Sequence, residues 1–281
     1  MITFDRVKPL TKYLFQQKVA HKTIGLVPTM GALHQGHFSL IAASQKQNDI
    51  TVCSIYVNPT QFNQISDLKK YPRNLAEDKT KLRSLGCDVL FCPSDQEMYP
   101  QPTELKFDFG SLASHMEGKH RPGHFNGVAT VVAKLFNQVK PDRAYFGQKD
   151  LQQYVIIQQM VRDLGFSLTL QQVPIIRETD GLALSSRNQR LTRKQRQVAP
   201  QLYQGLKLAA MQMKEGAGIP KARRKVRDHM KKFREIELEY FQIVNADNLH
   251  PINGCENNKV ALCMAAYLGK VRLIDNLIII C

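Results

Sequence analysis

The chain has 281 residues, 43% of them apolar, and a formal net charge of +15 at pH 7. This length and apolar content can bury a sizeable core, in one large domain or two modest ones. Charges are scattered through the first residues and no window approaches 18 uninterrupted apolar residues, which argues against a secretory leader and a membrane-spanning helix. We therefore expect a soluble, cytoplasmic protein that does not associate with membranes.

Apolar runs and amphipathic segments alternate through the first 176 residues. Strands are predicted at residues 23–28, 50–57, 88–93, 143–147 and 168–176. Helical periodicity fills the intervals at residues 37–47, 74–86, 125–139 and 150–165. Alternation of strand and helix is typical of a parallel sheet flanked by helices. We expect an α/β domain over residues 1–176, with a Rossmann-like parallel sheet and helices on both faces.

The pattern changes beyond about residue 177. A polar segment leads into a basic helical region, and three strands then follow without helices between them, at residues 237–245, 259–269 and 271–280. The short turn at Gly269 and Lys270 predicts an antiparallel hairpin. We therefore expect a smaller C-terminal α+β domain with antiparallel strands over residues 177–281.

The positive charge is concentrated between Arg187 and Arg234, where 15 lysines and arginines face 2 acidic residues. Such a block is what a nucleic-acid-binding module needs, because neutralisation of phosphates supplies most sequence-independent affinity. The periodicity favours an amphipathic helix, in which Ile219, Val226, Met230 and Phe233 face a core while the basic residues stay solvated.

Six cysteines are spread along the chain without a CxxC pair, and most lie in apolar runs: Cys53, Cys87, Cys92, Cys255, Cys263 and Cys281. This distribution favours reduced thiols over disulfides or a metal site. It fits the cytoplasm.

Residues 27–40, VPTMGALHQGHFSL, join a predicted strand to a predicted helix. The N–H groups and dipole of a helix N-terminus favour an anion there, and His34 and His37 can donate to phosphate oxygens. Gly31 and Gly36 allow the backbone to approach a ligand closely. HxxH spacing can also hold zinc, but no third ligand stands nearby, and two incidental histidines are the remaining alternative. The stretch favours a nucleotide site.

Two further stretches extend this interpretation. In YFGQKDLQQ, residues 145–153, a strand ends at Gly147, and Lys149 and Asp150 stand at the start of a helix, where the lysine can reach a phosphate. In GLALSSRN, residues 181–188, the serines and the arginine can clamp a triphosphate. Each stretch alone is equally compatible with an ordinary helix cap or a solvated loop.

Together these stretches resemble the pantoate–β-alanine ligase (pantothenate synthetase) family of the HxGH nucleotidyltransferase superfamily. The resemblance covers nearly the whole chain and includes VPTMGALHQGH, NPTQF, RPGHFNGVATVVAKLFNQVKPDRAYFGQKDLQQ and RETDGLALSSRN in the order and spacing of the family. GLALSSRN is similar to the KMSKS loop of class I aminoacyl-tRNA synthetases. The chain departs from the family pattern at Gln148, where Glu is expected, at Thr179, where Pro is expected, and at Leu184, where Met is expected.

The resemblance implies an ATP-dependent ligase of coenzyme A precursor biosynthesis. In this reaction (R)-pantoate attacks the α-phosphate of ATP to form pantoyl adenylate and pyrophosphate, and β-alanine then displaces AMP to give pantothenate. Mg²⁺ is expected to accompany ATP as a ligand of its phosphates, since the sequence shows no carboxylate cage. The resemblance also implies a homodimer whose other partners are small-molecule substrates, with no nucleic acid.

The resemblance assigns roles by matching positions. His37, His34 and Lys149 are the implied catalytic residues, with His37 as the proton donor. Gln61 and Gln153 are the implied ligands of pantoate, and Asn58 is a further candidate. The implied ATP-binding residues are Met30, Gly31, Ala32, Leu33, His34, Gln35, Gly36, His37, Gly147, Gln148, Lys149, Asp150, Ile176, Leu184, Ser185, Ser186 and Arg187. No protein ligand of a metal is implied, and the C-terminal domain is expected to close over the active site.

Two questions stay open at this stage. The RPGHF segment, which begins at Arg121 and includes His124, is interpreted as a structural or lid element.

A nucleotidyltransferase that transfers AMP or CMP to a phosphate-bearing acceptor would keep the same fold, but Gln61 and Gln153 suit a small hydroxy acid better. A nucleic-acid-binding module lacks support, because the chain has no tryptophan and no aromatic residues interleave the basic block in an RNA-binding pattern.

Overall fold

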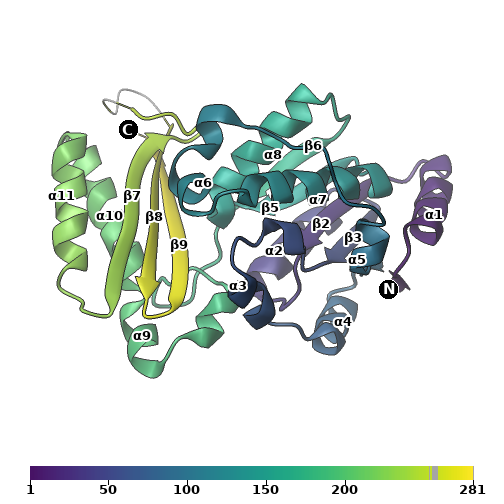
Figure 1. Cartoon of the computed structure of the whole chain (residues 1–281), viewed down its shortest axis with the longest axis horizontal. Coiled ribbons are helices and arrows are strands. Elements are labelled where there is room, and N and C mark those ends of the chain that lie inside the picture. The colour runs from purple at the N-terminus through teal and green to yellow at the C-terminus, as the bar shows by residue number, and fades with distance from the viewer. Residues whose placement is uncertain (253, 255–258, 281) are drawn as a thin grey trace. The chain divides into compact units, whose positions relative to one another are not determined.

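The computed structural model describes residues 1–252, 254 and 259–280. It divides into two compact units (Figure 1). The first unit comprises Met1–Gly147 and Ile156–Val173, and the second comprises Gln148–Val155 and Pro174–Cys281. The sequence predicts a boundary at residue 177, whereas the second unit begins at Pro174 and also takes up Gln148–Val155.

The first unit contains a six-stranded parallel sheet in the order β1-β4-β3-β2-β5-β6. The strands are β1 (Ile2–Phe4), β2 (Ile24–Thr29), β3 (Ile50–Ile55), β4 (Val89–Phe91), β5 (Arg143–Gly147) and β6 (Thr169–Val173). The parallel sheet and its five predicted strands are confirmed. The strand β1 was not predicted, because a run of three residues at the sheet edge is too short to show a hydrophobic period.

The helices that connect these strands confirm the predicted alternation: α2 (Gln35–Gln45), α4 (Leu75–Ser84), α7 (His124–Val139) and α8 (Leu151–Asp163). The short helices are α3 (Ile65–Lys70), α5 (Asp95–Met98) and α6 (Met116–His120). The helix α1 (Val7–Val19) was not predicted, because only Leu10 and Leu14 are buried on it and this apolar stripe is narrow. Side chains from β2, β3, β4, α2 and α4 share one apolar core.

The strand order places a topological switch point between β2 and β5. From β2 the chain proceeds through β3 and β4 in one direction, whereas β5 lies on the other side of β2 and leads to β6. Both strands point the same way, so Thr29 and Gly147 end them at the same edge of the sheet. Open parallel sheets bind ligands outside the carboxyl ends of the strands at such a point.

The described residues of the second unit include the start of α8, three further α-helices and three antiparallel strands. The further helices and the strands are α9 (Arg193–Val198), α10 (Gln201–Lys214), α11 (Ile219–Met230), β7 (Ile236–Asn245), β8 (Lys259–Leu268) and β9 (Val271–Ile280). The sheet order is β7-β8-β9, and Leu268 pairs with Val271 across the turn, which confirms the predicted hairpin.

The basic segment forms the predicted amphipathic helix. Ile219, Val226 and Met230 are buried in the core of the second unit, and Phe233 packs against it. The basic side chains therefore occupy the opposite face of α11. Cys53, Cys87, Cys92 and Cys263 are free thiols, whereas Cys255 and Cys281 lie outside the described residues. In the described part of the chain, no helix has the length and apolar character needed to cross a bilayer.

Candidate active site

The loop between β2 and α2 has an unusual backbone. Gly31 and Ala32 both have positive φ angles, 81° and 52°. The positive φ favours glycine at position 31, and a Cβ there would also be tightly placed, 3.0 Å from Asp78 Oδ2 and 3.1 Å from Ile55 Cγ2. Alanine rarely adopts this conformation, which means that other contacts must hold Ala32 in place.

Helix α4 supplies those contacts. The Asp78 carboxylate accepts hydrogen bonds from the backbone N–H of Ala32 at 2.9 Å and of Leu33 at 2.8 Å. Lys81 Nζ donates to the carbonyl oxygen of Leu33 at 2.9 Å. Asp78 is only 1% exposed, and the Leu33 side chain is buried in the apolar core. The loop is therefore held by backbone contacts, and Leu33 can meet a nucleotide only through its backbone.

The two histidines form a reciprocal cap at the start of α2. His34 Nδ1 accepts the backbone N–H of Gly36 at 3.1 Å, and His37 Nδ1 accepts the backbone N–H of His34 at 3.3 Å. Because a backbone N–H can only donate, each Nδ1 must carry a lone pair, and the proton of each neutral ring is on Nε2. The ring centroids are 4.1 Å apart. This arrangement makes Nε2–H the hydrogen-bond donor of both imidazoles.

The first turn of α2 contains no acidic residue. The positive end of its helix dipole is therefore not compensated by a carboxylate on its own first turn. Two imidazole donors and the helix N-terminus together form a site that suits an anionic ligand such as a phosphate. Gln35 is exposed on the same turn.

Gln61 lies in the short helix η1 (Pro59–Gln61), which follows β3. Its Nε2 donates to the Met30 thioether at 3.1 Å, and its Oε1 accepts from Asn58 Nδ2 at 3.2 Å. A thioether is a weak acceptor, so a carboxylate can readily replace it. The structure therefore brings Gln61, the predicted pantoate ligand, next to Met30, the first residue of the predicted ATP loop.

Asn58 is buried and engaged by the protein on both sides. Its Nδ2 also donates to the Gly127 carbonyl at 3.1 Å, and its Oδ1 accepts from Tyr99 Oη at 2.8 Å and Thr60 Oγ1 at 3.0 Å. Burial raises the pKa of Tyr99, so its hydroxyl stays protonated and donates at neutral pH. In this arrangement Asn58 is held by its other partners and orients the Gln61 side chain through its hydrogen bond to Gln61 Oε1.

In the second unit, Asn276 on β9 holds the turn that begins α8. Its Nδ2 donates to the carbonyl oxygens of Gln148 at 2.9 Å and Lys149 at 3.0 Å. Its Oδ1 accepts from Gln148 Nε2 at 3.1 Å. These contacts hold the backbone of Lys149, whose ammonium lies 3.8 Å from Asp150 Oδ1. Gln153 follows in the first turn of α8.

The neighbouring Asp275 fixes the start of the polar loop. Arg177 donates in a bidentate manner to Asp275 at 2.7 and 2.8 Å, and also to the carbonyl oxygens of Gly181 at 3.1 Å and Asn276 at 3.0 Å. The guanidinium carbon lies 3.8 Å from the centre of the Tyr203 ring. Burial raises the pKa of Asp275, and the Arg177 charge opposes this shift. The pair is desolvated and directional, which makes it a rigid anchor for the loop.

The loop folds back on itself into a compact structure. The Leu184 N–H donates to the Ile176 carbonyl at 3.0 Å, and Ser185 Oγ accepts from the Arg187 N–H at 3.3 Å. Ser186 is buried, and Arg187 is half-buried within η4 (Ser186–Arg190). The serines and the arginine are therefore presented by a short helical turn and not by an open coil.

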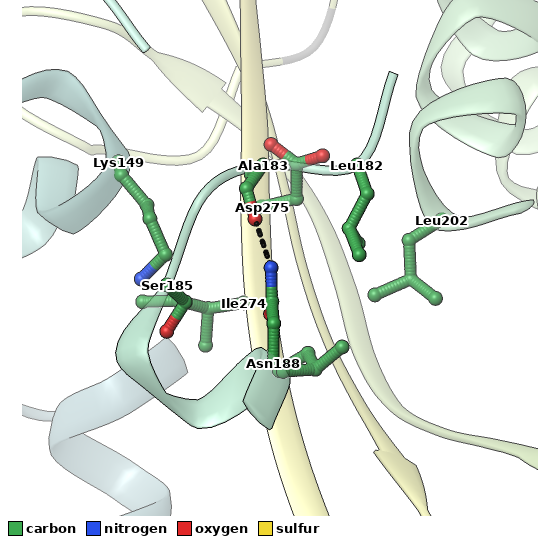
Figure 2. A pocket seen from close by; sticks show the side chains of 9 residues that line it. Lys149, Leu182, Ala183, Ser185, Asn188, Leu202, Ile274 and Asp275 are labelled. Atoms are coloured by element: carbon green, nitrogen blue, oxygen red, sulfur yellow. Dashed lines mark hydrogen bonds between the residues drawn. The ribbon is translucent and has the colours of Figure 1, made fainter. Parts of the chain in front are cut away.

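A pocket in the second unit is lined both by residues of this loop and by Lys149. It is lined by Lys149, Leu182, Ala183, Ser185, Asn188, Leu202, Leu273, Ile274 and Asp275. Figure 2 shows Lys149 and Ser185 on the same side of β9, with Asn188 donating to the Ala183 carbonyl. The structure thus brings two of the sequence-predicted phosphate contacts together within one unit.

The residues that hold these loops were not predicted from the sequence: Asp78, Arg177, Asp275 and Asn276. Asp78 resembles an ordinary acidic residue near the start of a helix, and nothing in its sequence surroundings indicates burial. Arg177 resembles one more charge in a polar loop. The Asp275-Asn276 pair did carry a signal, because two adjacent polar residues interrupt the apolar strand VRLIDNLIII.

Comparisons with known proteins agree on one family. A family model described as pantoate-beta-alanine ligase matches residues 2–278. The chain is 47% identical over 279 residues to the pantothenate synthetase of Porphyromonas gingivalis, with 99% of each chain covered. The pantothenate synthetase structure from Thermus thermophilus matches with a TM-score of 0.93 at 40% identity, with 99% of both chains covered. The pantoate-beta-alanine ligase of Francisella tularensis, solved with beta-gamma ATP and beta-alanine, matches with a TM-score of 0.83 at 37% identity, covering 99% of this chain and 97% of that one.

Proposed function

The chain belongs to the pantoate-β-alanine ligase family, and from this premise we propose that it condenses (R)-pantoate with β-alanine in an ATP-dependent reaction. The products are pantothenate, AMP and pyrophosphate, with pantoyl adenylate as the intermediate. The observation that carries the proposal is the 3.1 Å contact between Gln61 Nε2 and Met30 Sδ. It supports the proposal because it places an amide suited to a hydroxy acid beside a loop suited to a nucleotide.

Residues of the first unit, together with Gln153 of the second, are proposed to take the following roles in the first half-reaction. The Nε2–H groups of His34 and His37 donate to the phosphates of ATP, because each Nδ1 already accepts a backbone N–H and leaves the proton on Nε2. The family resemblance implies that His37 is the proton donor. Gln61 donates to the carboxylate of pantoate and accepts from a hydroxyl, and Gln153 is its proposed counterpart. A carboxylate oxygen of pantoate attacks the α-phosphorus, and the bond from this phosphorus to the bridging oxygen of pyrophosphate breaks.

Negative charge moves onto pyrophosphate as this bond breaks, and fixed cationic donors stabilise it. We assign that role to Lys149 and Arg187, with Ser185 and Ser186 as neutral donors.

In the second half-reaction the amine of β-alanine attacks the acyl carbon of the adenylate, the carbon–oxygen bond to AMP breaks, and the amine loses a proton. Residues 177–281 are proposed to close over the nucleotide during the first step and to exclude water from the mixed anhydride.

Magnesium is proposed to enter with ATP as a ligand of its phosphates. Over residues 1–252, 254 and 259–280, no three His, Cys, Asp or Glu side chains gather as metal ligands would. The carboxylate closest to the nucleotide loop, Asp78, is already occupied by two backbone N–H groups. A homodimer is proposed from the family resemblance, and a cytoplasmic location is proposed from the free thiols of Cys53, Cys87, Cys92 and Cys263.

The test is a reconstituted assay with purified protein, ATP, Mg²⁺ and pantoate, with and without β-alanine. Pyrophosphate release should require pantoate, whereas pantothenate and stoichiometric AMP should also require β-alanine. Release of AMP in the absence of pantoate would exclude the ligase function. Replacement of pantoate by phosphate-bearing acceptors tests the alternative of a nucleotidyltransferase, which predicts that such acceptors are consumed and pantoate is not.

A further inference from the structure

We propose that His124 is a positioning residue that fixes the backbone of Gln61 and thereby sets the acceptor site for pantoate. The inference rests on the proposed function for the identity of the acceptor. His124 is the first residue of α7 and is 5% exposed. Its Nδ1 lies 2.8 Å from the carbonyl oxygen of Gln61, 63 positions away in the chain.

Two contacts of this imidazole identify its tautomer. The Gln61 carbonyl can only accept a hydrogen bond, so Nδ1 must carry a proton. The Arg121 guanidinium can only donate, and its Nη1 lies 3.1 Å from His124 Nε2, so Nε2 must carry a lone pair. His124 is therefore the neutral Nδ1–H tautomer, which is the opposite of the tautomer found for His34 and His37.

Arg121 extends the contact to an acidic partner. Its Nη2 lies 3.5 Å from the same Gln61 carbonyl, and its Nη1 lies 3.8 Å from Glu117 Oε2. Glu117, Arg121 and His124 are all largely removed from solvent. An arginine held between a carboxylate and an imidazole has little freedom to move, so the imidazole and the carbonyl it holds are also fixed.

The next turn of α7 contacts the same segment through its backbone. The Gly127 carbonyl accepts from Asn58, and a Cβ on Gly127 would collide with the Thr60 carbonyl and come within 2.6 Å of the Gln61 backbone nitrogen. The segment Asn58–Gln61 therefore lies directly against the first two turns of α7, where His124 and Gly127 contact it.

The nucleotide loop is held by a different helix, and the Gln61 side chain contacts that loop only through the weak acceptor Met30 Sδ, at 3.1 Å. Asp78 on α4 holds residues 32 and 33, whereas His124 and Gly127 on α7 hold Gln61. A change at His124 should therefore weaken the use of pantoate while leaving ATP binding nearly unchanged. A residue that served only global stability would affect both substrates alike.

The decisive comparison uses two amide substitutions. In His124→Asn the amide nitrogen occupies roughly the place of Nδ1 and keeps the donor to Gln61, whereas in His124→Gln it occupies roughly that of Nε2 and loses this donor. We expect His124→Gln to raise the KM for pantoate at least about tenfold, His124→Asn to stay within about threefold of the wild type, and both to keep the KM for ATP within about twofold. Asn137→Ala, on the exposed face of the same helix, is the control and should change neither constant.

Gly127→Ala supplies an independent variant, because its methyl group should displace Gln61 and reproduce the pantoate-specific defect. Equal behaviour of His124→Asn and His124→Gln, or an equal rise in the KM for ATP, would overturn the proposal. The ¹⁵N chemical shifts of the His124 ring in the wild-type protein test it without any substitution: an Nδ1–H tautomer is expected, and an Nε2–H tautomer would contradict it. This measurement does not depend on activity, so failure of the ligase function in the reconstituted assay would be recognised separately.

Discussion

The carboxylate of Asp78 accepts the backbone N–H of Leu33 over 2.8 Å, across 45 positions of sequence. Together with its bond to Ala32, this contact holds a loop that contains a non-glycine residue in the left-handed region. The loop leads directly into His34, whose side chain caps α2. The geometry of the proposed nucleotide site therefore depends on a helix that is remote from it in sequence.

Replacement of Asp78 by alanine should lower both stability and adenylate formation. The change leaves two backbone donors without an acceptor, at about 1–3 kcal/mol for each buried donor. Urea unfolding measures the first effect and pantoate-dependent pyrophosphate release the second. Glu77→Gln, which removes the charge that pairs with Lys81 at the surface of the same helix, should leave the urea midpoint nearly unchanged. Comparable effects of the two substitutions would remove Asp78 from this role.

Replacement of Lys149 by alanine should reduce adenylate formation at least about a hundredfold, which corresponds to about 3 kcal/mol of transition-state stabilisation. The protein should still fold, because the backbone of the turn is held by Asn276 through the Lys149 carbonyl and not through its side chain. Single-turnover pyrophosphate release is the measurement. Lys225→Ala on the exposed face of α11 controls for the loss of one positive charge. A near-normal rate for Lys149→Ala would take the lysine out of the site.

Gly147 should be required for ATP binding but not for folding. A Cβ at this position would meet no atom of the described residues within 4 Å, so the packing of the chain does not demand glycine. Gly147→Ala should leave the free energy of unfolding within about 1 kcal/mol of the wild type and raise the KM for ATP about tenfold. Gly25→Ala should lower the free energy of unfolding and leave the KM for ATP nearly unchanged, since its Cβ would collide with Ser44 and lie 2.6 Å from Asn48 Nδ2. Normal ATP use by Gly147→Ala would show that no ligand approaches this turn.

Asn276→Asp should impair the nucleotide site through the backbone of the Gln148–Lys149 turn. The substitution preserves the size of the side chain but replaces two N–H donors by a carboxylate that faces two carbonyl oxygens. We expect adenylate formation to fall about tenfold, or about 1.4 kcal/mol. Asn248→Asp, in an exposed turn, is the matched control, because Asn248 uses its side chain only as an acceptor. Full activity of Asn276→Asp would show that this turn needs no such support.

The loop that contains Arg187 should become protected when ATP binds. Slower hydrogen exchange over residues 181–190 is expected with ATP and Mg²⁺, because the proposed closure brings Ser185, Ser186 and Arg187 onto the triphosphate. Arg187→Ala should impair the first half-reaction most, while Arg193→Ala on the exposed start of α9 should not. Unchanged exchange together with an intact first half-reaction in Arg187→Ala would mean that this loop is an ordinary connector.

The sequence by itself determined the features that local chemistry controls. Hydrophobic period distinguished the strands of the parallel sheet from the helices between them, and glycines and polar caps placed His34, His37 and Lys149 at strand-to-helix junctions. These inferences need only residues within a few positions of one another. The same reasoning placed Ile219, Val226 and Met230 on the buried face of the basic helix.

Only the tertiary structure decided what holds the site residues in place. The supporting contacts join residues far apart in the chain: Asp78 with Leu33, His124 with Gln61 across 63 positions, Arg177 with Asp275 across 98, and Asn276 with Lys149 across 127. A buried carboxylate or amide has the same sequence appearance as an exposed one, because burial depends on which elements pack together and not on neighbours along the chain. The tautomers of His34, His37 and His124 follow the same rule, since the hydrogen-bond partners that each imidazole meets in the folded chain determine which ring nitrogen carries the proton.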